Sequence, residues 1–306
     1  MILLIGLDGY SWSWEGALRE RGFDVAPLLS PHPVSWLGWN TIGTGVEAST
    51  WGLTADPKTY AAFGRSGKER PPYLWERLDD AGERVVIVNW PFVINPHLSN
   101  GVLVCGYPAG RIGFVQPLRE RDRWTYEDLD LSNAFELATV GPAVRQRLLR
   151  MAPQEHITAC TQRRGRLEES FIAAVKRQKP TLAFLGIMDL DRLCHYAYSS
   201  MQSDTERATI IAGVLDSVEH VVEALEPEAT ILCSDHGLDC SAPAQADGRG
   251  QGHDLGLPDS LRGILALKQD GLSLPSAEAA QIDVASMVQN RISEFGGVDM
   301  AAESPK

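Results

Sequence analysis

The chain has 306 residues, a length that can bury one large core, or one core with a smaller insertion. Hydrophobic residues make up 44% of the chain and charged residues 22%, and the formal net charge is −12. This acidic balance argues against a nucleic-acid-binding surface, which normally needs a basic patch. It does not exclude a small anionic substrate, because bound divalent metals would reverse the local field.

The sequence contains no segment of the kind that enters a membrane. The N-terminal sequence MILLIGLDGY has no basic residue before its apolar run, and that run is too short for a signal peptide or a membrane span. No later segment reaches the roughly 18 apolar residues that a span requires. The five cysteines have no CxxC spacing and are expected to be reduced. We therefore expect a cytoplasmic protein with no membrane partner, and the oligomeric state stays open.

Short apolar runs alternate with amphipathic segments along most of the chain. The runs predict buried strands at residues 2–7, 85–89, 181–188, 229–233 and 263–267. The amphipathic segments predict helices near residues 14–22, 75–82, 204–225 and 277–295. Ser203 and Glu206 form an S-x-x-E capping box at the start of the third helix. This alternation predicts an α/β fold with a parallel sheet and helices on both faces.

Residues 106–165 break the alternation. They are rich in arginine, aromatic residues and turn signals, and they contain no clear buried strand. We interpret them as an insertion or lid over the strand ends, within a single domain over residues 1–299. Residues 240–252 are expected to form a polar loop, and residues 300–306 a disordered tail.

Seven residues that could bind metals or attack phosphorus follow or neighbour the apolar runs. They are Asp8, Ser35, Asp191, His195, Asp235, His236 and His253. Open α/β sheets bind their ligands outside the carboxyl ends of the strands, where such residues would gather. Three imidazoles, three carboxylates and one hydroxyl suit two divalent metals and a nucleophile.

The spacing of these residues is informative but each motif is weak alone. Asp191 and His195 are four residues apart, so both can point the same way on a helical turn. Asp235 and His236 are adjacent where a strand leads into a loop, and His253 lies in a flexible, glycine-flanked segment.

A structural interpretation exists for each residue. A single aspartate after a strand commonly caps a helix or a turn, and a single histidine is more often structural than a ligand. Ser35 by itself fits a helix N-cap. The order of all seven along the chain favours the functional interpretation.

In that order, and with the surrounding sequence, the motifs resemble the alkaline phosphatase superfamily, and within it the type I phosphodiesterase/nucleotide pyrophosphatase branch. The matching segments are residues 4–9 (LIGLDG), 35–45 (SWLGWNTIGTG), 74–92, 191–195 (D-x-x-x-H), 234–237 (SDHG) and 252–253 (GH). They resemble, in turn, the opening strand with the first metal aspartate, the nucleophile segment, the helix and strand that follow, and the remaining ligand motifs. The resemblance covers residues 1–105 and 170–295.

The resemblance implies an alkaline-phosphatase-like sandwich, with a central, mainly parallel sheet flanked by helices, and two metal sites. One implied site comprises Asp8, Ser35, Asp235 and His236. The other comprises Asp191, His195 and His253. The implied metals are zinc, which imidazole ligands suit, although manganese or iron also fits mixed nitrogen and oxygen sites.

The implied activity is metal-dependent hydrolysis of phosphodiesters or nucleotide phosphoanhydrides, with a small-molecule phosphate ester or nucleotide as the substrate. Ser35 would attack phosphorus and form a covalent phospho-enzyme intermediate, which water then hydrolyses. Three alternatives stay open on the same scaffold: a phosphomonoesterase acting on a small phosphorylated metabolite, a phosphonate hydrolase, and a phosphotransferase. A non-enzymatic binding module is disfavoured because no ligand position is lost.

Four positions depart from the pattern of that branch. Ser35 stands where most phosphodiesterases have threonine. Serine at this position is commoner among monoesterases. Leu37 replaces a proline, Trp51 replaces a histidine, and Asp56 lies where an asparagine often binds a phosphoryl oxygen. The segment also lacks the C/S-x-P-x-R pattern of sulfatases, which argues against sulfate esters. Trp36, next to the nucleophile, could stack on a substrate ring, although packing is the commoner role of such a residue.

Overall fold

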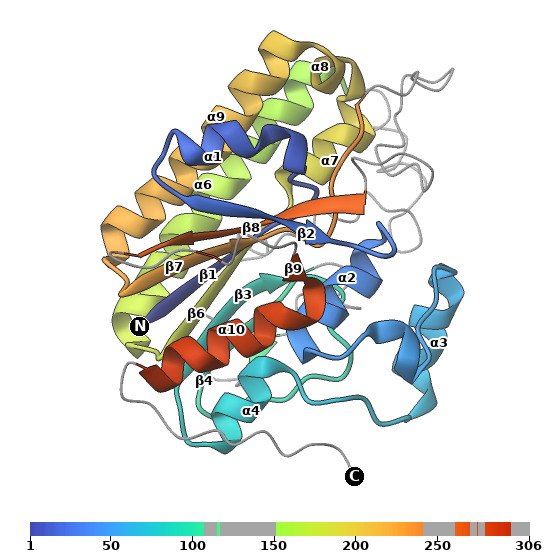
Figure 1. The fold of residues 1–306 in the computed structure, drawn as a ribbon, viewed down its shortest axis with the longest axis vertical. Coiled ribbons are helices and arrows are strands. Elements are labelled where there is room, and N and C mark those ends of the chain that lie inside the picture. Colours follow the sequence, from blue (N-terminus) through green and yellow to red (C-terminus); the bar gives the residue numbers. More distant parts are fainter. Residues whose placement is uncertain (107–114, 117–150, 241–260, 270–273, 275–278, 295–306) are drawn as a thin grey trace.

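The computed structural model describes residues 1–106, 115–116, 151–240, 261–269, 274 and 279–294. Within these residues, nine strands form one sheet through the middle of the molecule (Figure 1). In spatial order they are β5 (Val115–Gln116), β4 (Gly101–Cys105), β3 (Val85–Trp90), β6 (Leu182–Ile187), β1 (Ile2–Leu7), β7 (Ala229–Cys233), β8 (Arg262–Lys268), β2 (Asp24–Leu29) and β9 (Ala279–Ala280).

The middle of the sheet is parallel. Strands β4, β3, β6, β1 and β7 pair in parallel, whereas β8 runs antiparallel to both β7 and β2, and β5 runs antiparallel to β4. Every residue of β1, β3, β6 and β7 is buried, as expected for parallel strands covered on both faces. The predicted mainly parallel sheet is confirmed.

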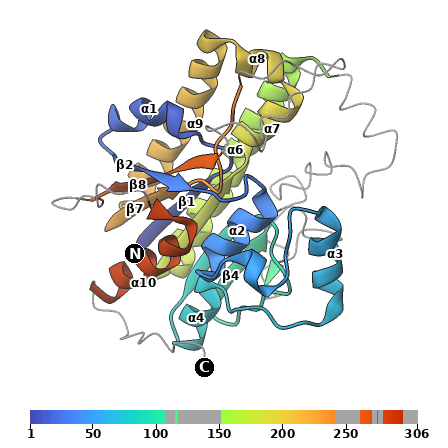
Figure 2. The same ribbon diagram turned by 45° about the vertical axis from the view of Figure 1, so that its right-hand side comes forward.

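Helices cover both faces of the sheet (Figures 1 and 2). On one face lie α1 (Glu15–Arg19), α6 (Pro153–Gln178), α7 (Asp189–Tyr196), α8 (Tyr198–Gln202) and α9 (Asp204–Leu225). On the other lie α2 (Ser35–Thr44), α3 (Pro57–Ser66), α4 (Leu74–Asp80) and α10 (Gln281–Glu294). Two short 3-10 helices, η1 (Trp12–Trp14) and η2 (Ala48–Trp51), precede α1 and α3.

Side chains that alternate along the central strand divide the core into two clusters. Leu3 and Ile5 of β1 pack in the cluster with α6 and α9, whereas Ile2 and Leu4 pack in the cluster with α2, α4 and α10. Apart from these two clusters, a smaller hydrophobic cluster beside α2 contains Leu37. The sheet thus holds both helical layers in a fixed relation to its carboxyl ends.

The five predicted strands and four predicted helices are all present, with ends shifted by a few residues. Ser203 begins α9, and its side-chain oxygen accepts a hydrogen bond from the Glu206 backbone nitrogen at 3.4 Å. The sequence did not predict β2 or α2. Pro27 lies within β2, and α2 contains two glycines, so neither segment carries the usual composition of its element.

The predicted insertion over residues 106–165 overlaps a core helix. Residues 153–165 form the first half of α6, whose buried side chains include Cys160 and Leu167 in the core. Val115 and Gln116 form β5. The remaining residues of that segment between 107 and 150 lie outside the described residues, as do most of the predicted loop and the tail at 300–306.

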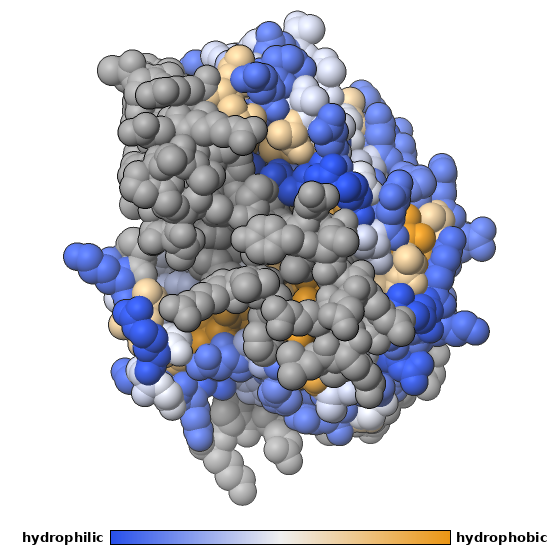
Figure 3. All heavy atoms as spheres, turned by 180° about the vertical axis from the view of Figure 1, so that it is seen from behind, coloured by the Kyte–Doolittle hydropathy of each residue, from blue (hydrophilic) through white to orange (hydrophobic). Residues whose placement is uncertain are grey.

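The described surface offers no membrane-spanning element. None of the helices in the described part of the chain is long and apolar enough to cross a membrane. Seen from behind, the described surface is mainly hydrophilic, with small apolar areas between hydrophilic ones (Figure 3).

Candidate metal centre

The candidate site lies at the carboxyl ends of three neighbouring parallel strands. Asp8 follows β1 directly, and its backbone nitrogen donates to Ile187 O at the end of β6 at 3.0 Å. Asp235 and His236 follow β7, on the other side of β1. Helix α7 begins just after β6, and the Asp191 nitrogen in its first turn donates to Asp8 O at 3.3 Å. Sheet topology therefore brings together residues that are far apart in the sequence.

Five of the seven predicted residues meet in one cluster. Ligand atoms of Asp8, Asp191 and His236 all lie within 4.8 Å of one another. His236 Nε2 is 3.4 Å from Asp8 Oδ1, 3.3 Å from Asp235 Oδ2 and 3.1 Å from Ser35 Oγ. The four side chains that the resemblance assigns to one metal are therefore neighbours, and Asp191, from the other assigned set, is close to two of them.

The second assigned set is described only in part. Asp191 and His195 lie one turn apart on α7, with His195 Nε2 3.5 Å from Asp191 Oδ1. The predicted helical turn is therefore present. His253 lies outside the described residues, so its role stays a prediction.

Ser35 is the first residue of α2. The residue before it, Val34, has extended backbone angles and makes no side-chain capping bond to the helix. The structure thus differs from the simple alternative in which Ser35 is itself the N-cap. The first backbone N–H groups of a helix lack partners within the helix, and they favour a negative charge placed beside them.

Burial makes the carboxylates of this cluster costly without a cation. Asp8 is 3% exposed, and Asp235 and His236 are fully buried. Asp8 Oδ1 and both side-chain oxygens of Asp235 accept no hydrogen bond from the described residues. Burial, and then the charge of Asp235 and Asp191, raises the pKa of Asp8; burial and then Asp191 raises the pKa of Asp235. The residues therefore fit a divalent cation, which would satisfy these oxygens and offset their charges.

Neighbouring groups orient the candidate ligands. Trp39 Nε1 donates to Asp8 Oδ2 at 3.1 Å, and His236 Nδ1 lies 2.9 Å from the Gly237 carbonyl oxygen. The second contact favours a proton on Nδ1, which leaves Nε2 with its lone pair toward the cluster. Gln281 of α10 donates from Nε2 to the Asp235 carbonyl oxygen. The sequence did not reveal these roles, because each contact joins residues from different elements.

A buried ion pair anchors the helix that carries Asp191 and His195. Asp189, the first residue of α7, is 4% exposed and pairs with Arg164 of α6. The Arg164 guanidinium also donates to Ser217 Oγ at 2.7 Å and to Gly213 O at 3.1 Å, both on α9. One arginine therefore joins α6, α7 and α9 immediately behind the cluster.

Comparisons with known proteins find this fold but no close relative. No family model matches the chain, and no curated protein matches it. Among solved structures, a 2-O GAG sulfatase has a TM-score of 0.56 at 11% identity, over 98% of this chain and 73% of that one. The phosphonate monoester hydrolase of Agrobacterium radiobacter has a TM-score of 0.53 at 14% identity, over 95% of this chain and 73% of that one. That of Silicibacter pomeroyi has a TM-score of 0.50 at 11% identity, with the same coverage.

The fold is alkaline-phosphatase-like. A sulfatase and phosphonate monoester hydrolases share this α/β fold, with its central, mainly parallel sheet flanked by helices, so the predicted fold class is confirmed. Similarity at this level of identity concerns the fold, and function depends on the residues of the site.

The raised pKa values predict how the stability of the metal-free protein depends on pH. Asp8 and Asp235 hold protons in the folded state that the unfolded chain releases above about pH 4. Their contribution to the free energy of unfolding is therefore complete below that pH and is lost as the pH rises through the raised values. In chelator-treated samples, Asp235→Asn should gain stability relative to the wild type as the pH rises, measured by denaturant unfolding. Parallel pH curves for the two proteins would contradict the prediction.

Chelator-treated wild type and Asp235→Asn also test whether the site binds a metal. Saturating Zn²⁺ should raise the melting temperature of the wild type, because a ligand that binds only the folded state contributes about 2.7 kcal/mol at 100 times its Kd. Asp235→Asn should weaken binding by roughly 10-fold or more, measured by calorimetric titration.

A close approach between α2 and the cluster yields a second prediction. A Cβ on Gly38 would lie 2.7 Å from Asp235 Cβ, so Gly38→Ala must push α2 away from Asp235. We expect a loss of about 1–3 kcal/mol in the free energy of unfolding and weaker Zn²⁺ binding. Gly64→Ala is the matched control, because Gly64 is also helical and a Cβ there meets no atom within 4 Å. Equal effects of the two substitutions would argue against the close packing.

The anchor of α7 yields a third prediction. Asp189→Asn leaves Arg164 buried with Glu168, 3.5 Å away, as its remaining charged partner, so it should cost roughly 1–3 kcal/mol of stability. It should also lower Zn²⁺ affinity, because α7 carries Asp191 and His195. The control Asp204→Asn removes the partner of Arg207 in a pair whose aspartate is 92% exposed. That loss should be below about 1 kcal/mol. Unchanged metal binding in Asp189→Asn would exclude the positioning role.

Proposed function

We propose that the protein is a metal-dependent hydrolase of phosphodiesters or nucleotide phosphoanhydrides, with Ser35 as its nucleophile. One observation carries the proposal. The Ser35 hydroxyl is 3.1 Å from His236 Nε2, which is itself within 3.4 Å of the Asp8 and Asp235 carboxylates. A hydroxyl at the edge of a buried, cation-binding cluster is the arrangement that metal-activated nucleophilic catalysis needs.

The residues divide into two cation-binding sets. Asp8, Asp235 and His236 would hold one cation beside Ser35. Asp191 and His195, with His253, would hold the other. Zinc is the expected metal because imidazole and carboxylate ligands suit it, and manganese or iron would also fit. Divalent cations held there would supply Lewis-acid chemistry, which favours an ionised nucleophile and offsets charge on the attacking and leaving oxygens.

Ser35 Oγ, after losing its proton to water, would attack phosphorus in line with the departing oxygen and form a phosphoseryl or nucleotidyl-seryl ester. The P–O bond to the leaving group breaks, and the departing oxygen takes up a proton from water. Water then cleaves this ester and regenerates the hydroxyl. The start of α2, which no side chain caps, would offer backbone N–H groups to the negative phosphoryl oxygens of a bound substrate. Gly237 O, by accepting the Nδ1 proton of His236, keeps the imidazole turned toward Ser35.

The residues after Ser35 disfavour a sulfate ester, although a sulfatase shares the fold. In the sulfatase pattern C/S-x-P-x-R, the proline position corresponds to Leu37 and the arginine position to Trp39. Trp39 is fully buried and donates its indole N–H to Asp8. The position at which sulfatases carry a cation is therefore occupied by a core side chain.

The aromatic residue that follows the nucleophile, Trp36, and the rings packed near it favour a diester substrate. Trp36 is partly buried, its ring is 6.0 Å from that of Phe92, and the Phe92 ring is 5.5 Å from that of Tyr60. Aromatic rings that border a bound substrate accommodate a second ester substituent or a base more readily than a phosphate dianion, which needs positive charge. The main alternative is a phosphomonoesterase for a small metabolite, which the serine at position 35 favours.

Turnover of three p-nitrophenyl substrates by the metal-replete protein tests the proposal. We expect bis-p-nitrophenyl phosphate to be hydrolysed faster than p-nitrophenyl phosphate or p-nitrophenyl phenylphosphonate. Ser35→Ala should lower kcat by roughly 10³-fold or more while its metal content, measured by elemental analysis, remains at the wild-type level.

The other outcomes separate the alternatives. A preference for the monoester would support the metabolite phosphatase, and a preference for the phosphonate would support a phosphonate monoester hydrolase. Turnover that survives in Ser35→Ala, or that does not depend on metal, would reject the proposed mechanism.

A further inference from the structure

A short segment beside α2 has an unfavourable backbone. Residues 91–100 join β3 to β4 at the nucleophile's side of the sheet, and Phe92 and Asn95 have φ angles of 54° and 41°. Left-handed conformations of residues other than glycine cost free energy, so they persist only where the surroundings determine them. The segment therefore depends on contacts from other elements.

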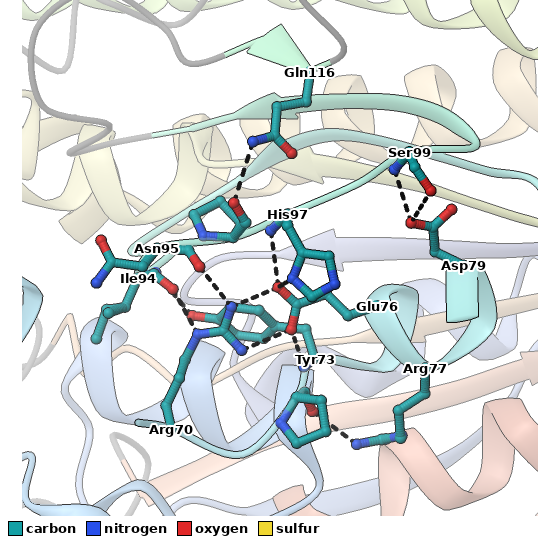
Figure 4. A network of polar contacts seen from close by, with 12 residues as sticks. Arg70, Tyr73, Glu76, Arg77, Asp79, Ile94, Asn95, His97, Ser99 and Gln116 are labelled. Atoms are coloured by element: carbon teal, nitrogen blue, oxygen red, sulfur yellow. Dashed lines mark hydrogen bonds and ion pairs between the residues drawn. The ribbon is translucent and has the colours of Figure 1, made fainter. Parts of the chain in front are cut away.

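A buried ion pair supplies part of these contacts (Figure 4). Glu76 of α4 is 1% exposed, and its carboxylate accepts from Arg70 Nη1 and Nη2 at 2.7 and 2.5 Å. The same carboxylate accepts from the His97 backbone nitrogen at 3.0 Å. Arg70 in turn donates to Ile94 O at 2.5 Å and to Asn95 O at 3.0 Å. The pair thereby fixes residues 94–97 from both sides.

Tyr73 links this pair to α2. Its backbone nitrogen donates to Glu76 at 2.8 Å, and the Arg70 guanidinium lies 3.9 Å from the centre of its ring. Its hydroxyl accepts from the Ile94 nitrogen at 2.9 Å and donates to Asn40 Oδ1 at 2.6 Å. Burial raises the pKa of Tyr73, so the hydroxyl keeps the proton that it donates.

Asn40 passes the constraint to the first turn of α2. It is 1% exposed, and its Nδ2 donates to Trp36 O at 2.7 Å and to Phe92 O at 2.9 Å. Trp36 directly follows Ser35. The side chain of Asn40 therefore joins the peptide unit next to the nucleophile to the strained segment that carries the Phe92 ring.

Helix α2 needs such a constraint. It contains Gly38 and Gly43, it has β-branched residues in its second half, and no side chain caps its start. Helix propensity alone holds such a segment weakly. The orientation of Ser35 relative to the metal cluster is therefore set by contacts made from outside the helix.

We propose that Asn40 and Tyr73 are positioning residues, which hold the first turn of α2, and with it Ser35, in line for attack. This inference rests on the proposed hydrolase function. Neither residue is among the candidate metal ligands, and both act through the first turn of α2. A displacement of about 1 Å in a reacting group can cost 10²-fold in rate, which gives the hydrogen bonds of Tyr73 a catalytic consequence.

The test is Tyr73→Phe, which removes one hydroxyl and keeps the ring. We expect kcat for bis-p-nitrophenyl phosphate to fall by roughly 10- to 100-fold, with KM and zinc content changed by less than about 2-fold. Backbone amides of residues 37–40 should exchange with deuterium faster than in the wild type. The fall in kcat together with faster exchange would support the proposal.

Tyr10→Phe is the matched control. Tyr10 is also fully buried, its hydroxyl donates to Trp14 O at 2.9 Å, and it belongs to the core cluster on the opposite face of the sheet. Tyr73→Phe loses two buried hydrogen bonds and Tyr10→Phe loses one that is partly buried, so both variants should melt at a lower temperature, with the larger fall in Tyr73→Phe. Only Tyr73→Phe should change kcat and the exchange of residues 37–40.

A second variant, Asn40→Ser, removes the donors to Trp36 and Phe92. Its effect on kcat should not add to that of Tyr73→Phe, because the two residues act in one chain of bonds. If Asn40→Ser does not fold, Tyr73→Phe and its control decide the question alone.

Equal kcat and equal exchange in Tyr73→Phe and Tyr10→Phe would overturn the inference. Absence of metal-dependent turnover in the wild type would instead reject the proposed function, and unchanged exchange of residues 37–40 in Tyr73→Phe would still exclude the positioning role.

Discussion

The crowding of buried carboxylates around one imidazole is the constraint on which the rest of the site depends. Asp8 and Asp235 have side-chain oxygens without hydrogen-bond donors among the described residues, and both lie within 3.4 Å of His236. Packing this charge into a core is unfavourable unless a cation compensates it. The surrounding structure must therefore hold the ligands in place against their own repulsion, and its most rigid elements do so.

Three sets of contacts provide that rigidity. Strands β1, β6 and β7 are buried along their whole length and end side by side, which fixes the backbone of Asp8 and Asp235. The Arg164–Asp189 pair fixes the start of α7 behind them. Gly38 lets α2 approach Asp235 closely enough for Ser35 to reach His236. The contacts of α2 join one face of the sheet to the strand ends, and the Arg164–Asp189 pair joins two helices on the other face, so the site forms only when the whole fold is assembled.

The proposed nucleophile and the proposed metal ligands are held by different sets of contacts, which meet where Trp39 of α2 donates to Asp8. The ligands depend on strand ends and α7, whereas α2 depends on Asn40, Tyr73 and the Arg70–Glu76 pair. A fold shared with sulfatases and phosphonate monoester hydrolases leaves the substrate open. The residues on which the proposed substrate preference rests are local ones, namely Ser35, the aromatic residues Trp36 and Phe92, and the buried Trp39.

The sequence alone predicted four of the five parallel strands, β1, β3, β6 and β7, because apolar runs are local properties of a segment, but it did not predict the fifth, β4. The sequence also predicted that Asp8, Ser35, Asp191, Asp235 and His236 gather at one site, and the structure brings them together. The reason is that residues which follow neighbouring parallel strands meet at one edge of the sheet. Helix α2, strand β2, and the start of α6 within the predicted insertion depended on tertiary contacts. Glycines and a proline obscured the first two, and the roles of Trp39, Arg164 and Tyr73 arise from contacts between residues distant in the chain. Local composition cannot reveal such contacts, because their partners are chosen only when the layers pack.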